Sequence, residues 1–133
     1  FVQVGKSALT FSNSYQQFVN VTHYANPTDS LLLQKQPLPP LNKNIFWFSV
    51  VNHLNTQILL SGGRNDSSET LKEVYTFDLS AGEWLEQREP DLNESRIDHG
   101  SCSLGNKVYV VCGYQYGKGY LDSIEVLDMS IER

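Results

Sequence analysis

Short apolar stretches separated by turn residues recur along this chain. Between Asn42 and Pro90 the runs FWFSVVNHL, QILLSGG, KEVYTFDL and EWLEQRE are divided by the polar breaks NT, RNDSSETL and SAG. Each run has the length of a strand and is enriched in β-branched and aromatic residues, and each break carries Asn, Asp, Ser or Gly. The pattern predicts four consecutive strands, and no stretch of the sequence predicts a helix.

The same pattern recurs further along the chain. When the sequence is shifted by fifty positions, ILLSGGRNDSSETLKEVYTFD (Ile58–Asp78) lies under VYVVCGYQYGKGYLDSIEVLD (Val108–Asp128) without a gap. Self-similarity at a period of about 40 to 50 residues, with about four strands in each unit, is typical of β-propeller blades. We therefore predict an all-β protein, a partial propeller of about two and two-thirds four-stranded antiparallel blades.

The repeat divides the chain into three predicted units. Residues 42–90 form a complete blade, and residues 91–133 form an incomplete blade that lacks its fourth strand, because the position equivalent to Trp84 falls just beyond Arg133. Residues 1–41 match less well and predict a divergent partial blade and a Pro-rich connector. Within that unit we expect a third strand at 16–21 with Asn20 in the place of Asp78, a polar loop at 22–29, and a fourth strand from Ser30 that passes into an extended connector at prolines 37, 39 and 40.

Composition and charge narrow the function classes. Residues 1–60 carry a net charge of +2 and residues 61–133 a net charge of −7, which together give −5. An acidic surface without a basic cluster argues against nucleic-acid binding. No apolar run approaches the roughly eighteen residues of a membrane span, so we expect no membrane association. The start on Phe1 without a signal-peptide pattern favours a fragment or processed form of a cytoplasmic protein.

The cysteine residues and the glycosylation sequons indicate the cellular compartment. Cys102 and Cys112 are the only cysteines, and a turn at Gly105–Asn106 would place Cys102 opposite Tyr109 and Cys112 opposite His99. Since the sulfurs would not face each other, we expect two buried free thiols in a reducing compartment. Glycosylation sequons occur at residues 20, 65 and 93, close to the number that chance alone produces, so a secreted or surface domain stays the weaker alternative.

Several motifs resemble the kelch-repeat β-propellers over residues 42–128, and more weakly over 1–41. They are the glycine pair that ends the second strand, the aromatic residues of the third and fourth strands, the SRIDHGS segment and the LDSIEVLD strand. The offset of fifty pairs Phe46 with Arg96 and Ser49 with His99, and Cys112 replaces the first glycine of the second pair. The resemblance implies structural roles for Gly62, Gly63, Tyr75, Asp78, Trp84, Arg96, His99, Gly113 and Asp128.

The sequence contains no motif that predicts a metal site, a cofactor site or a catalytic site. The histidines are at positions 23, 53 and 99, with no pair at metal-ligand spacing, so we expect neither a metal nor a cofactor. GYQYGKG, Gly113 to Gly119, departs from a phosphate-binding loop in its spacing and is followed by a strand. No nucleophile has an activating motif, and we expect no catalytic residues.

Function is therefore expected to be binding, through the loops on one face of the blades. The resemblance implies that a protein partner contacts the residues after each glycine pair, which are Arg64, Asn65, Tyr114, Gln115 and Tyr116. Alternatively, these are ordinary solvent-facing loop residues whose tyrosines pack on neighbouring blades. We expect a protein-interaction or scaffolding module, as part of a ubiquitin-ligase substrate adaptor or of a cytoskeletal or ciliary assembly; a kelch-fold oxidase or sugar mutarotase is the alternative. The remaining blades would come from the same polypeptide or from another subunit.

Overall fold

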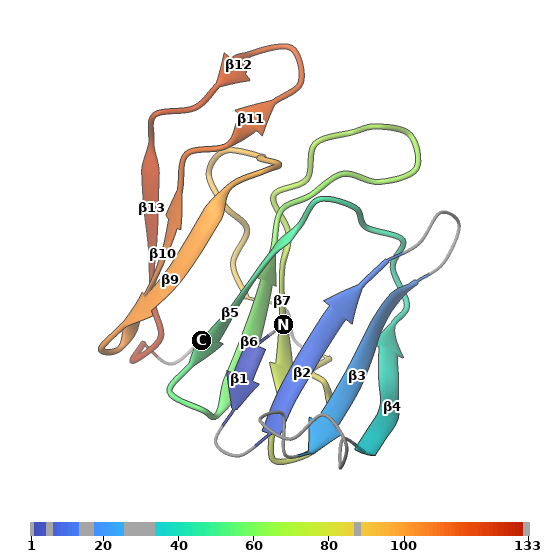
Figure 1. Ribbon diagram of the computed structural model, residues 1–133. Helices are drawn as coiled ribbons and strands as arrows, with labels where there is room; N and C mark the ends of the chain where they lie inside the picture. Colours follow the sequence, from blue (N-terminus) through green and yellow to red (C-terminus); the bar gives the residue numbers. More distant parts are fainter. Residues whose placement is uncertain (1, 5–6, 14–17, 26–33, 87–88, 132–133) are drawn as a thin grey trace.

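The computed structural model describes residues 2–4, 7–13, 18–25, 34–86 and 89–131. This part of the chain contains strands and loops and no helix, arranged as antiparallel sheets (Figure 1). The predicted all-β class and the partial propeller of four-stranded antiparallel blades are confirmed. The first sheet consists of β1 (Val2–Val4), β2 (Ser7–Ser12), β3 (Val19–Ala25) and β4 (Gln34–Leu41) in chain order.

The second sheet repeats this plan. It consists of β5 (Ser49–His53), β6 (Gln57–Ser61), β7 (Val74–Asp78) and β8 (Glu83–Trp84). The third sheet has the order β13-β10-β9, built from β9 (Gly100–Leu104), β10 (Lys107–Val111) and β13 (Ile124–Asp128). A two-stranded ribbon of β11 (Tyr114–Gln115) and β12 (Gly119–Tyr120) projects from its upper end in Figure 1. In the part of the chain that the structure describes, no strand lies along the outer edge of β13.

The register corrects the alignment of the repeats by one residue. From the first turn onward the offset of fifty holds, because Asp78 lies opposite Gln57 and Asp128 opposite Lys107. Before that turn the offset is fifty-one, since three residues separate β5 from β6 and only two separate β9 from β10. The pairing of Phe46 with Arg96 and of Ser49 with His99 is therefore wrong. Arg96 stands in the place of Ile45, and His99 in the place of Phe48.

The first sheet also differs from its expected outline. β3 extends through residues 22–25, which were expected in a polar loop, and Asn20 lies opposite Ser12 near the start of that strand rather than at the place of Asp78. β4 runs through all three prolines, which the sequence assigns to a connector. Proline is tolerated there because β4 pairs only with β3, so its other edge needs no amide donors. Residues 30–33 lie outside the described part, and the division into units 1–41, 42–90 and 91–133 stays a prediction.

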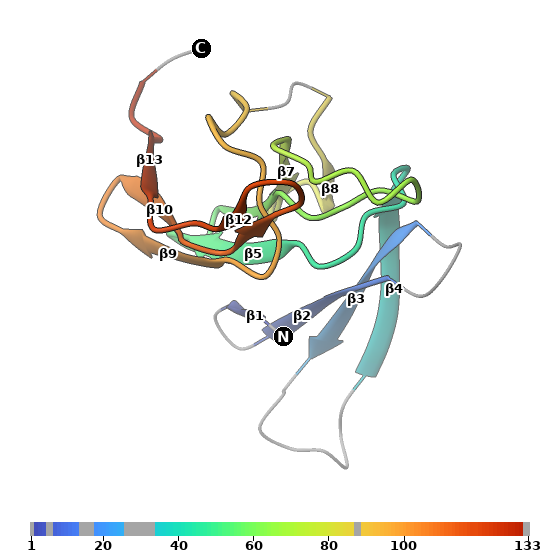
Figure 2. The same cartoon turned by 90° about the horizontal axis from the view of Figure 1, so that it is seen from above.

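Apolar side chains fill the two spaces between the three sheets. Along β6, Ile58 and Leu60 pack toward the first sheet while Leu59 packs toward the third, and all three are at most 2% exposed. Alternation of side chains along a strand thus buries both faces of the second sheet. Figure 2 shows the first sheet on one side of β5–β8 and the third sheet continuing on the other. Each sheet leans on its neighbour because none has a core of its own.

Gly63 and Gly113 occupy positions where both the backbone conformation and the neighbouring atoms require glycine. Gly63 has a φ of +96°, and a Cβ added to it would lie 2.5 Å from the carbonyl oxygen of Phe46. Gly113 has the same φ, and its added Cβ would lie 2.5 Å from the carbonyl oxygen of Ile97. Only glycine combines this left-handed conformation with so close a backbone approach.

Two glycine substitutions separate the effect of the left-handed φ from the effect of the close backbone approach. Gly117 has a φ of +85° but nothing within 4 Å of an added Cβ. We expect Gly117→Ala to lower the free energy of unfolding by about 1 kcal/mol and Gly63→Ala to lower it by about 3 kcal/mol or more, since only the latter adds a backbone clash to the strained φ. Denaturant unfolding measures both values, and equal losses would contradict the close-approach argument.

Candidate functional site

The loops that follow β6 and β10 lie at the same end of the sheets. Figure 1 shows the loop between β6 and β7 next to the ribbon of β11 and β12, at the top of the view. The two are in contact, because the backbone N–H of Tyr116 donates to Oγ1 of Thr70 at 3.1 Å. Loops from successive repeats therefore form one surface.

An open groove of about 470 Å³ lies on this surface, and we call it the aromatic groove. Tyr114 is at its centre, with ring centroids 5.8 Å from Tyr116 and 5.2 Å from Tyr120 in edge-to-face contacts. Tyr116 is 43% exposed, Trp47 51% and Tyr120 90%. The lining consists of Trp47, Ile97, Asp98, Cys112, Gly113, Tyr114, Tyr116, Tyr120 and Leu121. Exposed aromatic area of this kind is uncommon on a surface that makes no contacts.

Arg64 borders the aromatic groove through Trp47. Its guanidinium carbon lies 4.8 Å from the centroid of the Phe46 ring and 4.7 Å from that of Trp47, so the charged plane stacks against both rings. Nη1 also donates to the carbonyl oxygen of Asn65 at 3.2 Å. The guanidinium expected to meet a partner carboxylate is thus held on aromatic rings of its own chain, and its contact with a partner stays a prediction.

Asn65 and Gln115 lie outside the aromatic groove. The Asn65 side chain closes its own loop, donating from Nδ2 to a carboxylate oxygen of Glu69 at 2.7 Å and accepting from the Glu69 backbone N–H at 3.0 Å. Gln115 pairs with Gly119 in the ribbon and lines a separate depression. Of the five residues expected to bind a partner, the structure brings Tyr114 and Tyr116 together and places Arg64 beside them.

Tyr120 was expected, with Tyr114 and Tyr116, to offer contact area to a partner, whereas Trp47 and Asp98 were not anticipated as groove residues. Trp47 and Asp98 have φ values of +55° and +53° and occupy equivalent places in the second and third sheets. Their equivalence follows the offset of fifty-one that the ungapped alignment missed. The sequence signal for these two residues is their place in the turn before the first strand of each repeat, where one repeat has Trp and the next has Asp.

Arg96 is buried completely and joins the third sheet to the loop before it. The guanidinium donates to the carbonyl oxygen of Cys112 at 2.7 Å, to Oγ of Ser123 at 2.9 Å and to a carboxylate oxygen of Glu125 at 2.7 Å. Glu94 lies 3.7 Å away and bonds to Lys118 and Ser123, and the bond from Lys118 is the main cause of its lowered pKa. A buried charge with this many partners stabilises one arrangement of the loop.

His99 links the second and third sheets. Its Nε2 lies 3.0 Å from Oγ of Ser61 at the end of β6. Burial, and the nearby positive charge of Arg96, lower the pKa of His99 to about 4, so the ring is neutral at pH 7. A Cβ on Gly62 would lie 2.7 Å from Cε1 of this ring, which explains the first glycine of the pair.

Other residues of the kelch signature lie in turns and between sheets. Asp78 accepts hydrogen bonds from the backbone N–H groups of Ser80 and Ala81, and these bonds, that from Ala81 first, lower its pKa. Asp128 accepts from Ser130 in the same way. Trp84 packs edge-to-face on Phe77 at 5.3 Å and on Phe11 of the first sheet at 6.0 Å. Tyr75 packs against the cluster that contains Leu60.

Both cysteines are free, as expected, but they are exposed rather than buried. Cys102 lies opposite Tyr109, on the face of the third sheet that no other described sheet covers. Cys112 has a φ of +57° and lines the aromatic groove. The expectation of burial is wrong because no described sheet covers Cys102 and because Cys112 has a left-handed φ rather than strand geometry.

The described residues lack two structural features. They contain no helix that is both long and apolar enough to cross a membrane. They also hold no group of three or more His, Cys, Asp or Glu side chains placed to bind a metal ion.

Stacked antiparallel sheets, of which the second and third repeat at an offset of about fifty residues with Gly63 and Gly113 at equivalent loop ends, define a repeat protein built from β-propeller blades. Comparison with known sequences confirms which repeat it is. A family model for the kelch motif matches residues 95–132. The chain is 32% identical to human kelch domain-containing protein 3 over 79 residues, which are 58% of this chain and 21% of that protein.

Two further relatives match at a similar level. Human kelch-like protein 24 is 35% identical over 91 residues, which are 68% of this chain and 14% of that protein. The tRNA wybutosine-synthesizing protein 2/3/4 of Arabidopsis thaliana is 37% identical over 68 residues, 50% of this chain and 7% of that protein. The matched stretches therefore span about a fifth or less of these relatives, and the resemblance to kelch repeats is confirmed at that level.

The perturbed pKa of His99 predicts a pH dependence of stability. In the unfolded chain the pKa returns to about 6.5, so below this pH the unfolded state binds a proton that the folded state excludes until about pH 4. We expect the free energy of unfolding to fall by about 2 kcal/mol between pH 7 and pH 5. Denaturant unfolding at several pH values measures the slope.

The matched control is His99→Gln, which keeps a side-chain donor near Ser61 but does not titrate. Asp78 and Glu94 have lowered pKa values and stay ionised above pH 5, so they add little slope in this range. The variant is expected to flatten the dependence, and an unchanged slope in His99→Gln would assign it to other groups.

Proposed function

We propose that this chain is a protein-interaction module whose partner binds at the aromatic groove. The observation that supports this most is the gathering of half-exposed or exposed Trp47, Tyr116 and Tyr120 around one groove on the loop face. Tyrosine and tryptophan are enriched where partners bind, because they offer large contact areas with few rotatable bonds and a polar tip. The kelch motif and the kelch-named relatives point to the same class of function.

The charges around the aromatic groove suit a partner segment that carries a basic side chain. Asp98 is the only charged residue in the lining. Asp98 and Tyr114 of the third repeat are the equivalents of Trp47 and Arg64 of the second. In the second repeat the Arg64 guanidinium stacks on the Trp47 ring. In the third repeat the corresponding pair is a carboxylate and a ring, and the lining holds no cation. An arginine or lysine of the partner would supply it.

The finer role that we propose is substrate capture for a ubiquitin ligase or scaffolding in a cytoskeletal or ciliary assembly, in the cytoplasm. Both roles need a rigid frame that presents loops, and the antiparallel sheets supply this frame.

Removing the exposed rings tests the proposed contact surface. We expect Tyr116→Ala combined with Tyr120→Ala to weaken partner capture at least tenfold, since exposed aromatic anchors dominate binding energy. Thermal stability should change by no more than about 0.5 kcal/mol, because surface side chains contribute little to it. Quantitative affinity purification from cells, paired with thermal unfolding, measures both.

Asn106→Ala is the matched control, because Asn106 is exposed in the β9–β10 turn at the opposite end of the sheet. A double variant that captures the same partners as this control would refute the proposal.

A second partner surface is supported by the uncovered face of the third sheet. On this face Leu104 is 71% exposed, Ile124 60% and Val126 52%. The equivalent residues of the second sheet, His53, Val74 and Thr76, are at most 4% exposed because the third sheet covers them. We propose that a further β-sheet covers this face in the same way and supplies remaining blades from the same polypeptide or from another subunit.

The two cysteines distinguish a covered face from a free one. In the isolated chain both thiols are exposed and should react rapidly with maleimide. In the native protein we expect Cys102 to react at least about tenfold more slowly, because a covering sheet blocks it, while Cys112 in the groove stays reactive. Mass spectrometry of timed labelling gives both rates, and a Cys102 rate that is the same in the native protein as in the isolated chain would exclude the covering sheet.

A further inference from the structure

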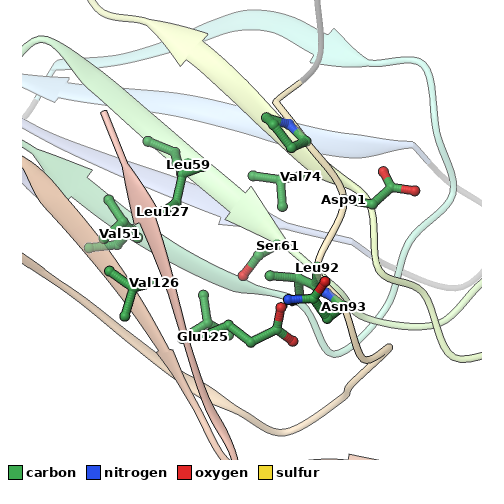
Figure 3. A pocket seen from close by; sticks show the side chains of 13 residues that line it. Val51, Leu59, Ser61, Val74, Asp91, Leu92, Asn93, Glu125, Val126 and Leu127 are labelled. Carbon is green, nitrogen blue, oxygen red and sulfur yellow. Dashed lines mark hydrogen bonds between the residues drawn. The ribbon is translucent and has the colours of Figure 1, made fainter. Parts of the chain in front are cut away.

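Aromatic rings rather than aliphatic side chains form the walls of the aromatic groove. Its lining includes the side chains of Trp47, Tyr114, Tyr116 and Tyr120. The cavity of about 250 Å³ between the second and third sheets has a different character, because its walls are aliphatic side chains such as Leu59 (Figure 3) and none of its lining residues is aromatic. The two spaces therefore suit occupants of different chemistry.

The tyrosine rings of the groove stand at steep angles to one another. The Tyr116 ring is inclined by 82° to the Tyr114 ring, and the Tyr120 ring by 73°. Rings at such angles form a concave corner, whereas parallel rings form a slot. A planar guanidinium fits a slot, but a corner presents rings on more than one side of a rounded cation.

The second repeat shows how this chain holds a cation on rings. The guanidinium carbon of Arg64 lies 4.8 and 4.7 Å from the ring centroids of Phe46 and Trp47, and the backbone of Arg64 bridges to Phe46. In the third repeat the equivalent bridge joins Ile97 to Tyr114, so a ring stands in the place of the cation. Arg64 itself lies outside the lining of the groove, which contains no Lys or Arg.

An unpaired carboxylate lies in the same lining. In the part of the chain that the structure describes, the exposed side chain of Asp98 forms no hydrogen bond or ion pair. A negative charge beside rings favours an occupant that is positively charged. Asp98 thus adds one charged hydrogen-bond acceptor to a site that is otherwise built mainly from rings.

The small number of acceptors indicates which cation the groove suits. An unmodified lysine has three N–H donors and is strongly hydrated, so placing it against rings leaves donors without acceptors. Methylation keeps the positive charge of lysine but replaces N–H donors by methyl groups, which pack on rings. A dimethylated lysine keeps a single N–H, and this number matches the single carboxylate of Asp98.

We propose that the aromatic groove binds a lysine of a partner protein that is methylated on Nζ, foremost dimethyl-lysine. The methyl groups contact the rings of Tyr114, Tyr116 and Tyr120, and the remaining N–H donates to the carboxylate of Asp98. Free or lipid-bound choline has no N–H for this bond, so the occupant is a protein side chain. This inference rests on the proposed function, because it names the chemistry of the partner that binds at the same groove.

Peptides that differ at a single side chain test the ligand class. The probe is a fluorescein-labelled Gly-Ser-Lys-Ser-Gly peptide with dimethyl-lysine at its centre. The controls carry unmodified lysine, trimethyl-lysine, or a neutral analogue with carbon in place of the dimethylammonium nitrogen. Fluorescence anisotropy with the native protein should show that the dimethyl-lysine peptide binds at least about tenfold more tightly than the lysine peptide and the neutral analogue, and about threefold more tightly than the trimethyl-lysine peptide.

Variants locate the bound ammonium group. Tyr120→Ala should weaken binding of the dimethyl-lysine peptide at least about fivefold, whereas Tyr120→Phe keeps the ring and should bind within about twofold of the unaltered protein. Asp98→Asn removes the charge and keeps a residue type that tolerates the φ of +53°, and it should abolish the preference for dimethyl-lysine over trimethyl-lysine. Asn106→Ala, at the opposite end of the sheet, should leave all four affinities unchanged.

Two results would overturn the inference. They are equal binding of the lysine and dimethyl-lysine peptides, and equal binding of the dimethyl-lysine peptide and its neutral analogue. The combined Tyr116→Ala and Tyr120→Ala variant separates this inference from the proposed function. Loss of partner capture in that variant together with equal binding of the lysine and dimethyl-lysine peptides would refute only the ligand class, whereas unchanged partner capture would refute the proposed function.

Discussion

Contact between sheets is the interaction on which this structure depends. A four-stranded sheet with apolar residues on both faces has no interior, and it becomes stable only when another sheet covers each face. Leu59 and Leu60 are neighbours in sequence, yet they belong to the cores on opposite sides of the second sheet. The close approach of Arg96 and His99 to Gly62 and the bond between His99 and Ser61 both join the second sheet to the third. Where a neighbour is present side chains are buried, and where none is described the same positions are exposed.

The loop face is a consequence of the stacking. Gly63 and Gly113 follow β6 and β10 at the same end of the sheets, so the segments after them lie beside one another and form one loop face. Trp47 links the second sheet to the aromatic groove of the third, and Arg64 stacks on its ring. Equivalent positions thus carry different chemistry in successive repeats, which lets a uniform scaffold present a specific surface.

The sequence predicts the strand positions because alternating apolar residues and turn residues are local signals, and Ile58–Asp78 aligns with Val108–Asp128 without a gap. The β5–β6 turn is one residue longer than the β9–β10 turn. The ungapped alignment does not show this difference, so it places Arg96 and His99 one position away from their true equivalents. In the first sheet the three prolines predict a connector rather than a strand, and this prediction is wrong because the outer edge of β4 requires no amide donors. Burial of Cys102 was wrong because it depends on a neighbouring sheet rather than on local sequence. Trp47 and Asp98 reach the aromatic groove only through packing of separate loops.

The bond between His99 and Ser61 also makes the order of the repeats non-interchangeable. On the uncovered face of the third sheet, Val111 stands where Ser61 stands in the second. A valine side chain cannot pair with a buried imidazole, so a duplicate of the third sheet stacked there would bury its histidine without an acceptor or donor. Each junction therefore selects its successor by polarity, and shuffling these units by recombination would cost stability even though their backbones are alike.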